Sequence, residues 1–110
     1  MFLTYSYSAS LTHMVIEFLT FRVPIEKREK WKLLDSEVWT RFLSTQEGFV
    51  KKELWQSPEN EDELHAVIWW KDKESWAAIT SDQISEVDKG MGEFLIEPVM
   101  REFMLLKVSD

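Results

Sequence analysis

The chain has no cysteine and only two histidines. Without cysteine there is neither a disulfide framework nor thiolate chemistry. No histidine pair stands at a metal-ligand spacing such as His-x-x-x-His, which argues against a zinc site. A glycine-rich phosphate loop and a Gly-x-Ser-x-Gly nucleophile motif are also missing. We therefore predict no metal site and no bound cofactor.

Basic residues are scarce as well. The 110 residues include 20 acidic and 13 basic ones, for a net charge of −7. Nucleic-acid binding needs positive charge to displace counterions from phosphates, so we expect no nucleic-acid partner. An anionic membrane surface is disfavoured for the same reason, and no apolar run approaches the ~20 residues of a membrane span. We predict a single domain, no membrane association and a cytoplasmic location.

Aromatic residues, by contrast, are plentiful, with six tryptophans. Four of them fall in residues 48–76, around which the chain is organised. Two apolar runs of strand length flank residues 57–62, whose Pro, Asn and Asp are typical of a hairpin connection. Asp72 follows the second run at a position where it can cap a helix. This stretch predicts strand, hairpin, strand and helix.

The remaining segments complete a simple order. Residues 14–22 read as a strand, and Pro24 opens a long amphipathic helix that Gly48 closes. Thr80 and Gln83 match a capping box before a second helix, which we expect to run through Gly90 and Gly92 towards Pro98. Residues 99–108 form the last strand. Residues 1–13 are predicted to be a loosely held extension, and residues 14–110 the domain.

The order strand, helix, strand, strand, helix, strand predicts an α+β fold. It is the ferredoxin-like βαββαβ arrangement, a four-stranded antiparallel sheet with helices on one face. The other face is apolar and no element is left to cover it, so we expect a homodimer formed through the sheets. The expected interface residues are Trp69, Val67, His65, Phe103 and Leu105. On that face His65 is interpreted as structural rather than as an acid or base.

On the helix-covered face we expect an apolar cavity for a small apolar or aromatic molecule. Its predicted lining is Trp70, Trp39, Ala66, Ile68, Phe18 and Met104. Packing alone explains most of the tryptophans equally well. No catalytic residue is evident, and Asp35 is a weak candidate because it lies beside the apolar stripe of the first helix. A solvated helix face explains Asp35 just as well.

Several of these residues carry a family resemblance. Gly48-Phe49-Val50, Trp70 and the following run of residues 71–76 resemble antibiotic-biosynthesis-monooxygenase-like domains. With Trp39 and Trp55 added, the chain is similar to a small cyanobacterial group within that superfamily. The resemblance implies a dimeric α/β barrel. Its members include monooxygenases that oxidise polycyclic aromatics without metal or flavin, haem-degrading enzymes and small isomerases.

The same resemblance argues against haem degradation. Haem-degrading members carry an Asn on the first strand and a His after the third, whereas residues 14–22 lack Asn and residues 76–96 lack both. Two hypotheses are left open. The first is a cofactor-independent monooxygenase that acts on a small aromatic or quinone-like molecule. The second is a non-catalytic dimeric module that binds a small ligand or a protein partner.

Overall fold

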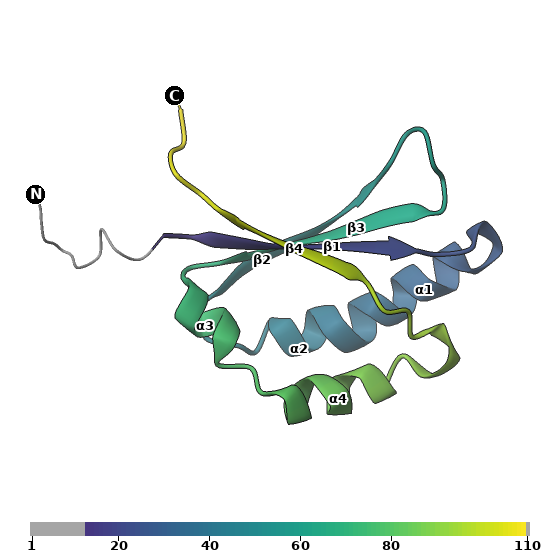
Figure 1. Ribbon diagram of the computed structural model, residues 1–110. Helices are drawn as coiled ribbons and strands as arrows, with labels where there is room; N and C mark the ends of the chain where they lie inside the picture. The colour runs from purple at the N-terminus through teal and green to yellow at the C-terminus, as the bar shows by residue number, and fades with distance from the viewer. Residues whose placement is uncertain (1–12, 110) are drawn as a thin grey trace, which may run out of the picture.

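The computed structural model describes residues 13–109, so nearly all of the predicted extension at residues 1–13 lies outside the described residues. Four strands form one antiparallel sheet in the order β2-β3-β1-β4 (Figure 1). Their bounds are Val15–Arg22 for β1, Phe49–Gln56 for β2, Glu63–Trp70 for β3 and Val99–Met104 for β4. All helices lie on one face of this sheet (Figure 1). The predicted ferredoxin-like fold is confirmed, although β4 ends at Met104 rather than at residue 108.

A long helical segment crosses from β1 to β2. It comprises η2 (Ile25–Lys27), α1 (Arg28–Asp35), η3 (Ser36–Thr40) and α2 (Arg41–Leu43). Its middle part, η3, is a π-helix, a form that is rare and concentrated at functional sites. Gly48 follows with φ of 88°, as predicted, and a Cβ there would overlap the side chain of Ser75.

The second helical region is shorter than the sequence suggests. Asp72 caps α3 (Lys73–Ala77), and the predicted capping box of Thr80 and Gln83 opens α4 (Ser81–Lys89). We expected the helix to include both glycines, and this is wrong. The helix ends before Gly90, where a Cβ would come within 2.9 Å of Val38 Cγ1, so this glycine allows α4 to approach η3. Gly92, with φ of 57°, starts the turn η4 (Gly92–Phe94).

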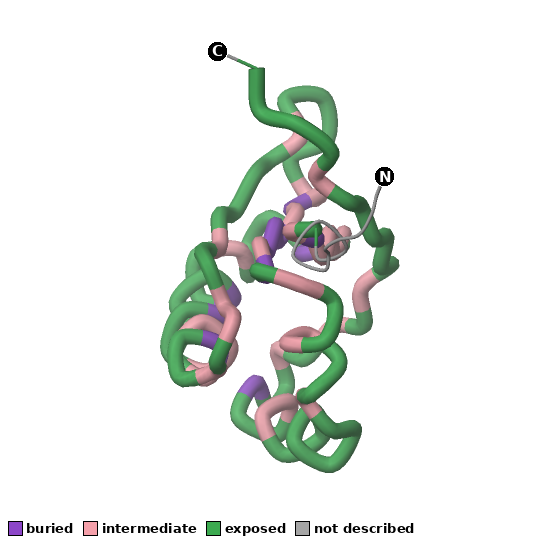
Figure 2. Tube along the Cα trace, turned by 90° about the vertical axis from the view of Figure 1, so that its left-hand side faces the viewer, coloured by how far each residue is buried: buried purple, intermediate pink, exposed green. Residues whose placement is uncertain are grey.

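Buried residues gather between the sheet and the first helical segment (Figure 2). One core cluster is centred on Trp70 and the other on Trp31, which are 0% and 1% exposed. Strand β3 supplies most of the floor, because it is a central strand with an apolar face towards the helices. No residue of α4 is fully buried, so that helix forms an outer wall rather than part of the core.

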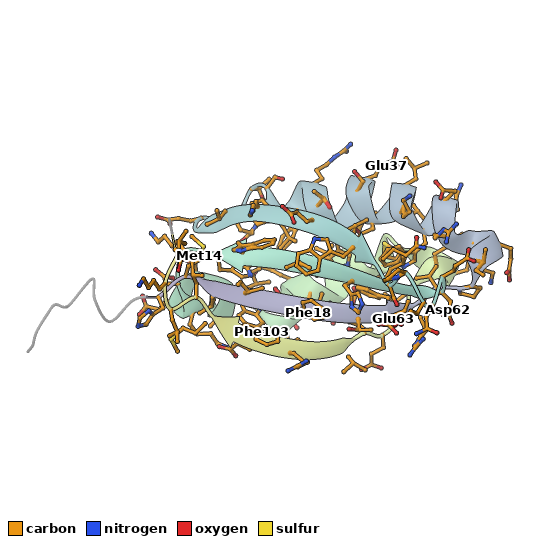
Figure 3. All side chains as sticks on the ribbon, turned by 90° about the horizontal axis from the view of Figure 1, so that it is seen from above. Met14, Phe18, Glu37, Asp62, Glu63 and Phe103 are labelled. Carbon is orange, nitrogen blue, oxygen red and sulfur yellow. The ribbon has the colours of Figure 1, made fainter. Side chains whose placement is uncertain are left out.

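The strand register corrects one expectation about β1. Partners in an antiparallel pair point to the same face, and Leu19 pairs with Ala66 whereas Phe18 pairs with Val67. Leu19 therefore faces the helices, and Phe18, which we placed in the cavity, lies on the opposite face beside Phe103 (Figure 3). Both faces of β1 are largely apolar, so hydrophobicity alone does not determine its orientation.

Candidate functional site

A cavity of about 820 Å³ lies between the helix-covered face of the sheet and the helices. Its floor comes from β1 and β3, one wall from α1 and η3, and the other from α3, α4 and the segment that leads into β4. The lining is mainly apolar, with six charged residues among it: Glu17, Asp35, Lys52, Lys73, Asp88 and Glu97. A volume of this size accommodates a small organic molecule of several rings.

Charged side chains form a row across the helix-covered face of the sheet, and Lys52 and Glu17 of this row line the cavity. Lys52 on β2 pairs with Ile68 on β3, Ile68 pairs with Glu17 on β1, and Glu17 pairs with Glu102 on β4. Because all four positions are in register, their side chains project to the same, helix-covered side. The sheet thus places a cation and two carboxylates in one line, with an apolar residue between Lys52 and Glu17.

Lys52 is held by two residues of the helix above it. Its Nζ lies 2.6 Å from Asp35 Oδ2 and 2.9 Å from Thr40 Oγ1, and the Lys52 and Asp35 side chains are each 5% exposed. In an α-helix, residues five apart point in different directions, about 140° apart from the 3.6-residue period. The π-turn between Asp35 and Thr40 changes this spacing and lets both reach one ammonium group.

Glu17 is a carboxyl group in a largely apolar environment. Burial raises its pKa above the ordinary value, and the hydrogen bond from Trp70 together with the nearby Lys52 and Lys73 partly opposes that rise. Trp70 Nε1 donates to Glu17 Oε1 at 3.1 Å, which fixes the carboxyl group at the cavity floor. A positioned carboxyl group of raised pKa is suited to exchange protons with a bound molecule.

Lys73 stands over the β4 side of the row. Its Nζ lies 2.6 Å from Glu102 Oε1 and 4.0 Å from the centre of the Trp76 ring. Both members of this ion pair are about half exposed, in contrast to the pair of Lys52 and Asp35. The contact therefore lies where the cavity meets solvent, between α3 and β4.

The outer wall is tied to the π-turn. Trp39 Nε1 donates to Asp88 Oδ1 of α4 at 3.0 Å, and Gly90 lies against Val38 just beyond. These contacts fix α4 to η3, and the space between α4 and the sheet is left for the cavity. Trp39 therefore contributes both a lining surface and a support for the opposite wall.

The predicted cavity residues divide into two groups. Trp39, Ala66, Ile68 and the candidate Asp35 line the cavity. Trp70, Phe18 and Met104 do not: Trp70 is fully buried beneath the lining, Phe18 is on the other face, and Met104 is 54% exposed at the sheet edge.

Two residues of the site, Lys52 and Glu17, were not predicted from the sequence. Strand alternation could have indicated Lys52, since it shares a face with Leu54 on the hairpin opposite Ala66 and Ile68. For Asp35 the signal was its spacing of four residues from both Trp31 and Trp39, which places a charge in the middle of an aromatic stripe. No comparable signal existed for Glu17, because its orientation depends on the register of β1.

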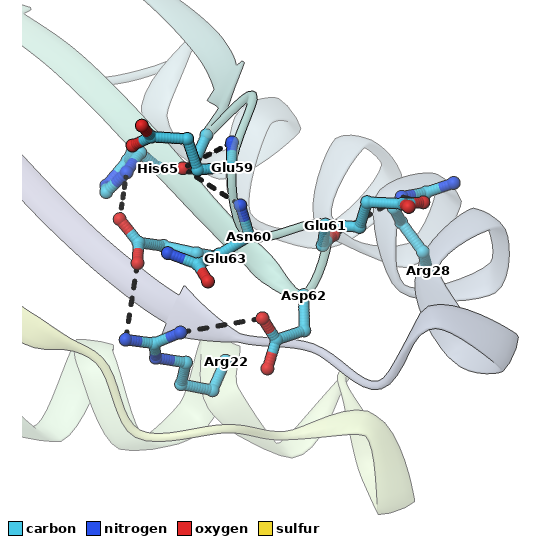
Figure 4. A network of polar contacts seen from close by, with 9 residues as sticks. Arg22, Arg28, Glu59, Asn60, Glu61, Asp62, Glu63 and His65 are labelled. Atoms are coloured by element: carbon cyan, nitrogen blue, oxygen red, sulfur yellow. Dashed lines mark hydrogen bonds and ion pairs between the residues drawn. The ribbon is translucent and has the colours of Figure 1, made fainter.

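His65 lies on the opposite face, as predicted, in a polar network at the hairpin end of the sheet (Figure 4). Its Nε2 is 3.0 Å from Glu63 Oε2, its Nδ1 is 3.0 Å from Thr20 Oγ1, and Glu63 continues to Arg22 at 3.2 Å. Both ring nitrogens are therefore engaged, which supports a structural role. Within residues 13–109, no group of three metal-ligating side chains is assembled.

Comparison with known families identifies the chain. Residues 14–83 match the family model described as antibiotic biosynthesis monooxygenase, which covers more than half of the sequence. The chain belongs to this family. No functionally curated protein matches the sequence significantly. Among the described residues, no helix is long and apolar enough to cross a membrane.

Solved structures share the fold at low sequence identity. A conserved protein from Methanosarcina mazei has a TM-score of 0.64 and 22% identity over 93% of this chain and 99% of its own. A Bordetella bronchiseptica protein that carries the same family description has a TM-score of 0.72 and 15% identity over 86% and 99%. A variant of SnoaB, a cofactor-independent oxygenase from Streptomyces nogalater, has a TM-score of 0.61 and 13% identity over 86% and 93%.

Proposed function

We propose that the cavity binds a small aromatic or quinone-like molecule and that the protein oxidises it with O₂, without metal or flavin. The observation that carries this proposal is Glu17, a carboxyl group with a raised pKa held at the floor of an apolar cavity by Trp70. The family match and the likeness to a cofactor-independent oxygenase support the same reaction class. Membership of the cyanobacterial group is a finer prediction that rests on the residues that resemble it.

In the proposed reaction the substrate supplies all the electrons. Glu17 accepts a proton from an acidic C–H or O–H of a hydroxylated aromatic ring, and the resulting carbanion or phenolate is electron-rich enough to react with O₂. A ring methylene becomes a carbonyl, one oxygen atom stays in the product, and the other leaves as water. The four electrons that O₂ takes up equal those lost by the methylene carbon, and Glu17 returns its proton to the departing oxygen.

Asp35, the weaker sequence candidate, has a different role in this proposal. Its carboxylate is already engaged in a buried ion pair with Lys52. Glu17 has no cation in direct contact and accepts only the neutral indole N–H of Trp70 among the described residues. The base is therefore assigned to Glu17, and Asp35 is assigned to holding Lys52.

Oxygen consumption with a panel of hydroxyanthrones and hydroxynaphthalenes tests this function. We expect the wild type to consume O₂ and form a quinone, and Glu17→Gln to slow turnover by about 10²–10⁴-fold, the usual contribution of a positioned base. Glu102→Gln is the matched control, because it changes the neighbouring carboxylate of the same row at the solvent-exposed end. Binding of these compounds without O₂ uptake would favour the alternative, a non-catalytic ligand-binding module.

We also propose that the uncovered sheet face joins two copies of the chain. It presents Trp55 and Phe103, which are 45% and 39% exposed, around the partly buried Phe18. An aromatic surface of this kind is costly in water and suits a homodimer interface. The predicted residues Trp69, Val67, His65 and Phe103 lie on this face by register, and Leu105 follows the end of β4.

A further inference from the structure

We propose that Lys52 binds an oxygen atom of the ligand and thereby selects aromatic molecules that carry a carbonyl or phenolate oxygen across the ring from the proton that Glu17 accepts. This inference rests on the proposed function of the cavity. Lys52 lines the cavity, yet its side chain is only 5% exposed. A lysine is seldom buried to this degree without a specific role.

The ammonium group of Lys52 has one donor to spare. A lysine has three N–H donors, and the described residues engage two of them, through Asp35 Oδ2 and Thr40 Oγ1. Both acceptors belong to the helix above the sheet, so they hold the ammonium from one side. The remaining donor is available to an acceptor atom of a molecule in the cavity.

The sheet sets the spacing between this donor and the base. Lys52 and Glu17 occupy β2 and β1, with Ile68 of β3 between them in the same register row. Two strand spacings separate their backbones by about 10 Å. Ile68 and the small Ala66 provide a flat apolar floor between the two charges. A planar ring system can rest on this floor with one polar edge at Glu17 and the opposite edge at Lys52.

This placement gives Lys52 a role in the proton transfer. When Glu17 removes a proton from the ring, negative charge spreads through the ring to its carbonyl or phenolate oxygen. An ammonium at that oxygen stabilises the anion, and stabilisation of developing charge by a fixed group is a strong catalytic effect. Asp35 holds the Lys52 ammonium group in place, and it is therefore a positioning residue for Lys52.

Two probe compounds test the selection of ligands. The first, 4-acetyl-1-naphthol, carries its hydroxyl and carbonyl groups at opposite edges of the ring, whereas 1-naphthol lacks the carbonyl. We expect the wild type to bind the ketone about tenfold more tightly, as one charge-assisted hydrogen bond predicts. Bound ketone should also show the absorption spectrum of its anion at a lower pH than free ketone does.

The double variant Asp35→Asn/Lys52→Met removes the cation without leaving a buried charge unpaired. It should bind both probes with equal affinity and lose the shift towards the anion spectrum. Lys73→Met is the matched control, since it removes the other lysine of the lining, and it should keep the preference for the ketone. Circular dichroism of each variant establishes that it is folded before binding is measured.

The outcomes separate this inference from the function on which it rests. Equal binding of the two probes by the wild type, or a preference that persists in the folded double variant, would overturn the role of Lys52 alone. Failure of both probes to bind the wild type would contradict the proposed ligand class as well. If the double variant does not fold, equal binding of the two probes by the wild type, or loss of the ketone preference in Lys73→Met, would still overturn the role of Lys52.

Discussion

The two faces of the sheet differ in the side chains that they enclose or expose. The helix-covered face encloses charges, among them Glu17, Lys52 and Asp35, at the floor and wall of a cavity. The uncovered face instead presents aromatic rings, with Phe18, Trp55 and Phe103 in edge-to-face contact. On β1, for example, the adjacent residues Glu17 and Phe18 place a carboxyl group inside and an aromatic ring outside.

The enclosed charges and the exposed aromatic rings both lower the stability of an isolated chain. The reason why each is retained indicates its role. A carboxyl group kept in an apolar cavity is retained where its altered protonation is used. Exposed aromatic rings are retained where a partner covers them. We therefore propose that the helix-covered face serves the chemistry and that the uncovered face serves assembly.

The largest expected effect is a difference in stability between substitutions of the two neighbouring tryptophans on β3, Trp69 and Trp70. Trp70 is fully buried on the helix-covered side, so Trp70→Ala should lower the free energy of unfolding by about 3–5 kcal/mol. It also removes the donor to Glu17. Trp69 faces the other side, and Trp69→Ala should cost much less. Urea denaturation of both variants measures the contrast, and equal losses would mean that the two faces are buried alike.

The next largest effect on stability is expected from the buried ion pair between Lys52 and Asp35. Asp35→Asn leaves the ammonium of Lys52 buried without a counter-charge, beside neutral oxygen acceptors only, and it should destabilise the protein by about 3 kcal/mol. The cavity can admit water to that ammonium, so the lower end of the usual range applies. Thermal unfolding should show that adding Lys52→Met to this variant restores much of the loss. A double variant as unstable as the single one would show that the charge pair itself is not the cause.

A charge introduced on the uncovered face should change the oligomeric state. Trp69→Glu places a carboxylate among aromatic rings on the proposed dimer interface, where Lys51, the cation against the Trp69 ring, is already paired with Glu53. Size exclusion with light scattering should give twice the mass of the chain for the wild type and the mass of one chain for the variant. Val50→Glu, which changes an exposed residue at the strand irregularity, is a control for added charge. A monomeric wild type would contradict the assembly role of this face.

The fold was predictable because local signals agree with one another. Asp72 and the Thr80–Gln83 capping box mark helix starts, and Gly48 marks a turn, each through a contact within a few residues. The lining from β3 was predictable too, since Ala66 and Ile68 share the apolar face of a central strand.

The chemistry of the site could not be predicted in the same way. Whether Glu17 or Phe18 faces the cavity depends on the register of β1 against β3 and β4, because both faces of β1 are apolar enough to be buried. The contact between Lys52 and Asp35 joins residues on different elements, and the π-turn that aligns Asp35 with Thr40 has no clear sequence signature. Tertiary contacts determine these features, and propensity or periodicity does not encode them.

The smallest expected effect is the stability cost of Glu17 itself. Its pKa is raised in the folded protein, so the folded state binds its proton more tightly than the unfolded state does. At acid pH Glu17 is protonated in both the folded and the unfolded state, so its raised pKa does not affect the free energy of unfolding. As pH rises through the range between the unfolded and folded pKa values, Glu17 lowers the free energy of unfolding. Above that range the folded protein must hold a buried anion.

Glu17→Gln removes this cost while its side-chain carbonyl can still accept the hydrogen bond from Trp70. The variant should therefore be more stable than the wild type at neutral pH, by less than about 1 kcal/mol, the size of a mild single substitution. Its advantage should disappear as pH falls through the ordinary range of carboxyl groups. Melting temperatures of the two proteins measured across a pH series provide the test. A difference that does not vary with pH, or that favours the wild type at neutral pH, would show that Glu17 is not the enclosed, costly carboxyl group that distinguishes the two faces.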